Sequence, residues 1–207
     1  MRIIQVGAMA LGLALAVVPA SPARGATVLR LSFEELATRA EAVVRGRVVS
    51  STARRDAASG RIFTYTEVEV TEAVKGAPGK KVTVRQPGGE VGGIGQSVAG
   101  AARFAPGEEV VLFLEKARDE ASTSFQVLSM SAGKVRLEKR LSSVRAVRDL
   151  DGIQFPDQPA KDAARSGVKV VSSQDLGDGE AFLTRVRTAV RAGAKASPKA
   201  KAKAVKP

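Results

Sequence analysis

Residues 62–71, with the sequence IFTYTEVEVT, alternate more regularly than any other part of the chain. The even-numbered positions hold Ile, Thr, Thr, Val and Val, whereas the odd-numbered positions hold Phe, Tyr, Glu, Glu and Thr. A period of two places these sets on opposite faces of an extended strand. The segment therefore predicts a long strand that is buried on one face only.

The neighbouring segments predict further strands around this one. Residues 43–50, VVRGRVVS, are rich in β-branched residues and are separated from the long strand by the turn sequence DAASG at 56–60, which predicts a hairpin. Gly46 inside that strand predicts a bulge or a close backbone approach. The continuous apolar run VVLFL at 110–114 predicts a central strand buried on both faces. Further strands are expected at 81–85, 125–130, 134–138 and 144–148.

Helices are expected only near the two ends of the folded region. Ser32 and Glu35 have the spacing of a capping box, which predicts a short helix that ends near residues 40–42. Phe182, Leu183, Val186 and Val190 share one face of a C-terminal helix, expected over 173–193 with its end at Gly193. The predicted fold is mainly β: a small antiparallel β-barrel, OB-like, or a sandwich, with a short N-terminal helix and a C-terminal helix. The β-barrel domain is expected over 26–153 and a linker or loop over 154–172.

Residues 1–25 have the layout of a secretory signal peptide. Met1-Arg2 give a positive start, Ile3–Val18 form an uncharged apolar run, and small residues follow Pro19. The apolar run is shorter than the roughly 20 residues that a spanning helix needs. We expect cleavage near Gly25 or Ala26, an exported protein in the periplasm or outside the cell, and no transmembrane segment after cleavage.

The composition excludes several function classes. The 207 residues contain no Cys and no His, which excludes disulfides, Cys/His zinc sites, a Ser-His-Asp triad and a Cys-His dyad. The formal net charge is +12, but five lysines lie in the last fourteen residues, Ala194–Pro207, and two arginines lie before residue 26. The remainder, 26 positive against 21 negative residues, has a net charge of +5. We therefore expect a disordered Lys/Ala-rich tail at 194–207 and no nucleic-acid partner.

The segment 87–95, PGGEVGGIG, is the one candidate site. A phosphate-binding loop is disfavoured, because no helix pattern follows it. Two interpretations stay open: a barrel-rim loop that contacts a ligand or a protein, and a structural excursion in which glycines supply positive φ for a bulge or wide turn. The candidate binding residues are Arg85, Gly88, Gly89, Glu90, Gly92, Gly93, Gly95 and Arg103.

Catalytic chemistry would have to come from carboxylates. The candidate groups are Glu34 with Glu35, residues 67, 69 and 72, and Glu108 with Glu109. The first pair belongs to a helix cap, and the others are expected to be solvated charges. Asp149 and Asp151 lie in a turn without the oxygen-rich loop that Ca²⁺ requires. We expect no catalytic residues, no metal and no cofactor.

Several motifs carry a resemblance to a known group of proteins. They are VKG at 74–76, QPGGEVGG at 86–93 and FAPGE at 104–108, together with the LSFEEL segment at 31–36. Over residues 31–137 and the C-terminal helix, the chain resembles a family of uncharacterised exported bacterial proteins that is common in myxobacteria. The resemblance implies export and a β-rich fold, but no activity.

A more distant similarity is to the OB-like barrel of netrin modules and of tissue inhibitors of metalloproteinases. In that group an N-terminal cysteine inhibits the protease zinc. This chain has no cysteine, so the activity cannot be transferred.

Three hypotheses follow from the sequence. The leading one is an exported, non-enzymatic binding or interaction module whose partner is an unknown protein or envelope polymer. The second is an inhibitor or accessory factor of an exported protease. The third is an envelope-associated structural protein that is tethered by its basic tail. The oligomeric state is not predicted.

Overall fold

The computed structural model describes residues 26–117, 123–155 and 173–196. The predicted signal peptide and most of the predicted linker and tail therefore lie outside the described residues. In chain order the elements are β1 (Ala26–Thr27), α1 (Phe33–Arg39), β2 (Ala42–Arg55), β3 (Ile62–Lys75), β4 (Lys81–Pro87), β5 (Gly89–Val91), β6 (Ile94–Gln96), β7 (Glu109–Lys116), β8 (Phe125–Val127), the 3-10 helix η1 (Met130–Gly133), β9 (Lys134–Arg140), β10 (Ser143–Asp149), β11 (Ile153–Gln154), β12 (Ser173–Asp178) and α3 (Gly179–Ala196).

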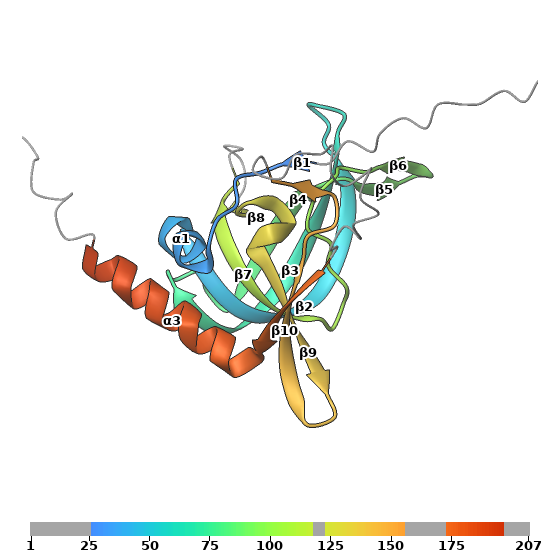
Figure 1. Cartoon of the computed structure of the whole chain (residues 1–207). Coiled ribbons are helices and arrows are strands. Elements are labelled where there is room, and N and C mark those ends of the chain that lie inside the picture. The colour runs from blue at the N-terminus through green and yellow to red at the C-terminus, as the bar shows by residue number, and fades with distance from the viewer. Residues whose placement is uncertain (1–25, 118–122, 156–172, 197–207) are drawn as a thin grey trace, which may run out of the picture.

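The fold is mainly β, and five of its strands close into a ring (Figure 1). The ring runs in the order β7, β2, β3, β4 and β8, and it closes because β8 pairs with both neighbours. One residue pair joins β8 to β4 in parallel, and three pairs join it to β7. Strands β9, β10 and β12 extend the sheet beyond β7. The predicted barrel with an N-terminal and a C-terminal helix is confirmed.

Two hydrophobic cores lie on opposite faces of the ring strands. In β7, Val110, Leu112 and Leu114 face the barrel interior, whereas Val111 and Phe113 face the helices. All five are fully buried, so the prediction of a central strand buried on both faces is confirmed. Full burial of side chains of this size contributes about 1.5–3 kcal/mol each. This strand therefore contributes to both hydrophobic cores.

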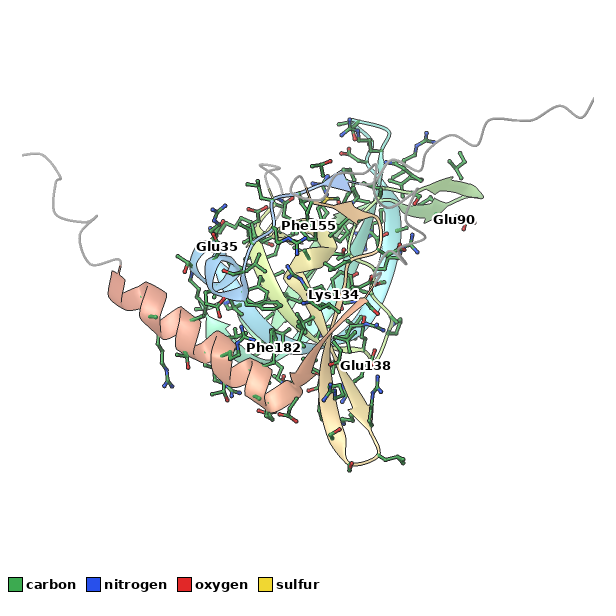
Figure 2. All side chains as sticks on the ribbon, in the orientation of Figure 1. Glu35, Glu90, Lys134, Glu138, Phe155 and Phe182 are labelled. Carbon is green, nitrogen blue, oxygen red and sulfur yellow. The ribbon has the colours of Figure 1, made fainter. Side chains whose placement is uncertain are left out.

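The helices cover the outer core on one side of the barrel. The capping box of α1 is present: Ser32 Oγ accepts from the Glu35 amide, and a Glu35 carboxylate oxygen accepts from the Ser32 amide at 2.8 Å. Phe33 of α1 meets Phe182 of α3 edge to face, with ring centroids 4.9 Å apart. Figure 2 shows Phe182 on the side of α3 that faces the strands and Glu90 on the opposite side of the molecule.

Gly46 is both a bulge site and a point of close approach, as the sequence predicted. The register of β2 against β3 shifts between Arg45 and Gly46. A Cβ at Gly46 would lie 2.5 Å from the carbonyl oxygen of Glu69. Glycine is therefore required at this position because a side chain would clash with the neighbouring backbone, and not because φ is positive.

The C-terminal prediction was partly wrong. Residues 173–178 form the edge strand β12 paired with β10, and α3 begins only at Gly179, where Asp178 accepts from the amides of Glu180 and Ala181. The helix continues past Gly193 to Ala196. A Cβ at Gly193 would lie 3.2 Å from Thr38 Oγ1, so this glycine lets α3 pack against α1 instead of ending the helix.

Two local predictions also differ from the structure. The strand expected over 125–130 ends at Val127, because Ser129 and Met130 adopt positive φ values of 61° and 57° and lead into η1. Within the expected linker, Gln154 belongs to the short strand β11, which pairs in parallel with β1.

Candidate functional site

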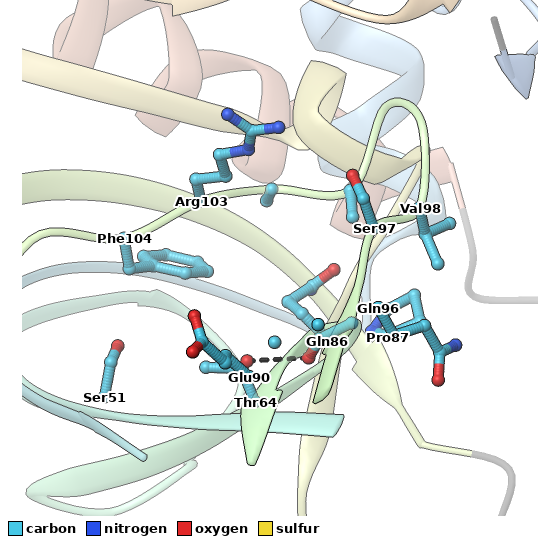
Figure 3. Close-up of a pocket in the computed structure, with 15 residues that line it drawn as sticks. Ser51, Thr64, Gln86, Pro87, Glu90, Gln96, Ser97, Val98, Arg103 and Phe104 are labelled. Carbon is cyan, nitrogen blue, oxygen red and sulfur yellow. Dashed lines mark hydrogen bonds between the residues drawn. The ribbon is translucent and has the colours of Figure 1, made fainter. Parts of the chain in front are cut away.

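A pocket of about 510 Å³ opens at one end of the barrel, beside the β5–β6 hairpin (Figure 3). We call it the barrel-mouth pocket. It is lined by Ser51, Thr64, Gln86, Pro87, Gly88, Gly89, Glu90, Gly95, Gln96, Ser97, Val98, Ala101, Ala102, Arg103 and Phe104.

The pocket exists because the barrel interior changes from apolar to polar along its length. On β4, Val82 and Val84 belong to the barrel core, and the next position in phase is Gln86. On β3, Val68 belongs to the same core, whereas Thr64 lines the pocket. Since alternate residues of a strand face the same side, the ends of these strands bring hydroxyl and amide groups together at one barrel mouth.

Gln86 is the central polar group of the pocket. The residue is only 5 % exposed, and its Nε2 has no hydrogen-bond partner among the described residues. Figure 3 places it between the β4 end and the ring of Phe104. A buried amide without a partner costs about 1–3 kcal/mol. By contrast, the hydroxyl groups of Ser51 and Thr66 form a hydrogen bond with each other, with their oxygen atoms 2.7 Å apart.

One wall of the pocket is the segment 97–105, and Lys134 supports it from behind. Lys134 is 4 % exposed; its Nζ donates to Oε2 of Glu108 at 2.8 Å and to the carbonyl oxygen of Arg103. The same Nζ lies 4.6 Å from the centroid of the Phe104 ring. Burial lowers the pKa of Lys134, and the bond to Glu108 opposes this lowering. The ion pair and the cation–π contact therefore hold the wall against β9.

The glycine-rich segment forms a two-stranded hairpin on the other side of the pocket. β5 and β6 are joined by Gly92 and Gly93, both with positive φ, as a two-residue hairpin turn requires. Two side-chain bonds fix its base: Thr64 Oγ1 donates to the Gly88 carbonyl at 2.8 Å, and Gln96 Oε1 accepts from the Ile62 amide at 3.0 Å.

The glycines of this hairpin have different surroundings. A Cβ at Gly88 would lie 2.8 Å from the Gln96 carbonyl oxygen, and one at Gly89 would lie 2.6 Å from Thr64 Oγ1. Those two glycines let the chain approach itself, and they have positive φ values of 101° and 132°, which agrees with the structural interpretation. Gly95, by contrast, has open space around its Cβ position.

The structure brings together five of the eight predicted binding residues. Gly88, Gly89, Glu90, Gly95 and Arg103 all line the barrel-mouth pocket. Glu90 points into the space below the Phe104 ring, whereas the guanidinium group of Arg103 is directed away from Glu90 in the view of Figure 3.

The other three predicted residues do not line the pocket. Arg85 precedes the inward-facing Gln86 on β4 and therefore lies on the opposite face of the strand. There its guanidinium group lies 3.6 Å from the centroid of the Phe63 ring. Gly92 and Gly93 form the tip of the hairpin, with open space around both Cβ positions.

Sequence reasoning missed the barrel-interior half of the site. Ser51, Thr64, Gln86 and Phe104 line the pocket but were not predicted as binding residues. A signal was available, because Gln86 is in phase with Val82 and Val84, and Thr64 is in phase with Val68. A polar residue that continues an inward-facing apolar series marks a polar interior or the mouth of a barrel.

Of the seven carboxylates considered for catalysis, five form structural contacts, whereas Glu67 and Glu69 lie exposed on β3. The expectation that Glu108 and Glu109 are solvated charges was wrong, because their side chains are only 13 % and 15 % exposed. Glu35 caps α1, Glu72 forms two hydrogen bonds with Arg187, Glu108 pairs with Lys134, and Glu109 pairs with Arg45 at 2.6 Å. Within residues 26–117, 123–155 and 173–196, no group of three or more acidic side chains is placed to hold a metal ion.

A comparison of the chain with protein-family models and with curated proteins found no match. Among the helices in the described ranges, none combines the length and the apolar character needed to cross a bilayer. The resemblance to exported bacterial proteins therefore stays a prediction.

Proposed function

We propose that this protein is an exported, non-enzymatic binding module and that the barrel-mouth pocket is its ligand site. The proposed export rests on the signal-peptide pattern of residues 1–25. The proposed binding role rests on one observation above all: Gln86 lines the pocket, and the buried Nε2 of its amide is unpartnered in the described structure. A ligand oxygen bonded to this amide would remove its desolvation cost.

The proposal of a non-catalytic role rests on the types of side chain present. The chain has neither His nor Cys, and five of the seven carboxylates named above form structural contacts. Among the described residues that line the pocket, Glu90 has the only carboxylate, so these residues offer no pair of carboxyl groups for general acid–base chemistry.

The test is a titration of the ¹⁵N-labelled protein, expressed from the full chain, with a panel of small polar solutes. The panel contains neutral sugars, free amino acids, short peptides, dicarboxylic acids and inorganic phosphate. We expect at least one class to give saturable shifts at pocket residues such as Glu90 and Gly95, and Gln86→Leu to weaken this binding about tenfold, the effect of one buried hydrogen bond. The matched control is Gln126→Leu, whose amide donates to Glu115 at 2.7 Å outside the pocket. Absence of any Gln86-dependent binding across the panel would overturn the proposal.

A further inference from the structure

The groups in the barrel-mouth pocket define a chemical class of ligand. Phe104 supplies an aromatic ring on one side, and Figure 3 places Ser51, Thr64, Gln86 and Glu90 around the opposite side. An aromatic ring that faces a cluster of polar groups suits a ligand with one apolar face and a polar edge.

The hydrogen-bonding capacity of these groups is mixed. Nε2 of Gln86 can only donate, and the Glu90 carboxylate can accept through two oxygens. The Thr64 hydroxyl already donates its proton to Gly88, so toward a ligand it can only accept. A ligand made of hydroxyl groups fits this set, because each hydroxyl both donates and accepts.

The charges near the pocket disfavour ionic ligands of either sign. An anion would meet the Glu90 carboxylate, which stands in the pocket and forms no ion pair within the described residues. Arg103 also lines the pocket, but its guanidinium group is directed away from Glu90 and from the Phe104 ring in Figure 3. A cation on the Phe104 ring would meet a second positive charge, because the Lys134 ammonium already lies 4.6 Å from that ring. In a partly enclosed site both repulsions are stronger than in water. A neutral ligand avoids both.

We propose that the barrel-mouth pocket binds a neutral pyranose sugar, free or as a unit of an uncharged glycan. The C–H face of the sugar ring lies on Phe104. Neighbouring hydroxyls donate to the Glu90 carboxylate and accept from the Gln86 amide. The cavity of about 510 Å³ is within the range of about 300–1,000 Å³ that is usual for small-molecule sites. This inference rests on the function proposed above, since it names the ligand of the same pocket.

The experiment uses the ¹⁵N-labelled protein expressed from the full chain and measures dissociation constants by NMR titration. The sugar probes are glucose, galactose, N-acetylglucosamine, cellobiose and lactose, and the other probes are glycerol, lysine, glutamate and inorganic phosphate. We expect at least one sugar to bind with saturable shifts at the pocket and every other probe to bind at least about tenfold more weakly.

Three variants assign the contacts. Gln86→Leu and Glu90→Gln are each expected to weaken sugar binding about tenfold, the effect of one buried or charge-assisted hydrogen bond. Phe104→Leu keeps the apolar volume but removes the ring and should weaken binding roughly fivefold. Glu67→Gln, on an exposed position of β3, is the matched control and should leave sugar binding unchanged.

The outcomes separate this inference from the proposed function. Pocket binding of lysine, glutamate or phosphate in preference to every sugar, with dependence on Gln86, would overturn the sugar assignment and leave the binding module intact. Sugar binding that is insensitive to both Gln86→Leu and Glu90→Gln would overturn the assignment as well. Failure of all probes, together with failure of the wider panel above, would remove both proposals.

Discussion

The Nζ atom of Lys134 lies 2.8 Å from Oε2 of Glu108, with side chains 5 % and 13 % exposed. The pair joins the start of β9 to the turn that follows the wall segment 97–105 of the barrel-mouth pocket, and Lys134 also bonds to the Arg103 carbonyl within that segment. Burial disfavours the charged ammonium, as its lowered pKa indicates. Removing only one partner of this ion pair would leave the other charge buried without its partner, which would destabilise the fold.

Removing the Lys134 charge should destabilise the protein measurably. We expect Lys134→Met to lower the free energy of unfolding by about 2 kcal/mol, below the roughly 3–5 kcal/mol of a fully buried pair. The loss is smaller because Arg136 stays 3.8 Å from the same Glu108 carboxylate. Urea unfolding measures it, and Lys139→Met, at an exposed position of the same strand, is the matched control. A Lys134→Met protein as stable as this control would contradict the structural role.

Replacing Gln86 should stabilise the ligand-free protein. Gln86→Leu removes a buried amide whose Nε2 is unpartnered among the described residues and extends the apolar series of Val82 and Val84. We expect a gain of about 1 kcal/mol in the free energy of unfolding, as is typical when a binding group is exchanged for core packing. Gln126→Leu breaks a formed hydrogen bond and should give no gain. If Gln86→Leu unfolds more easily than the parent, then the amide is satisfied in the native state.

Features set by local pattern could be predicted from the sequence. The alternation in residues 62–71, the apolar run 110–114 and the capping box of Ser32 and Glu35 each depend on residues close together in the chain, and all three are present. The edge strand β12 was missed because the sequence SQDLGD has no apolar alternation. It forms through pairing with β10, which supplies its hydrogen bonds.

For a similar reason, only the part of the candidate site that depends on local sequence could be predicted. The hairpin segment stands out in the sequence by its glycine content, so Glu90 and Gly95 were among the predicted binding residues. Gln86 and Thr64 become a site only through register, because β3 and β4 pair Thr64 directly with Gln86. The ring must also close through β8, whose three-residue strand contacts both β4 and β7 far apart in sequence. No local pattern encodes that closure.

Two glycines should differ sharply in their tolerance of alanine. Gly46→Ala places a Cβ 2.5 Å from the Glu69 carbonyl oxygen, where backbone must move, and should cost about 2–3 kcal/mol. Gly95→Ala meets nothing within 4 Å and should change the free energy of unfolding by less than about 0.5 kcal/mol. Chemical unfolding of the two variants side by side measures this difference. Equal stability of both would mean that β2 and β3 do not approach as closely as described.

The docking of α3 should weaken in acid. Arg187 donates to both carboxylate oxygens of Glu72, at 2.8 and 2.7 Å, and these bonds lower the pKa of Glu72 below its ordinary value of 4.5. A carboxylate with a lowered pKa stabilises the fold fully above pH 4.5, and the contribution is lost as the pH falls through the folded-state pKa. We expect Glu72→Gln to cost about 1 kcal/mol at pH 7 and to differ progressively less from the parent toward pH 3.

The measurement is the free energy of unfolding of parent and Glu72→Gln at a series of pH values. Far-UV circular dichroism follows the helices, α3 being the longer of the two in the described part of the chain. Glu67→Gln removes a carboxylate from an exposed position of the same strand that makes no ion pair within the described ranges, and it should follow the parent at every pH. A difference between parent and Glu72→Gln that stays constant from pH 7 to pH 3 would show that the Glu72 carboxylate does not change its protonation there. In that case the two hydrogen bonds to Arg187 would not be the cause of acid sensitivity.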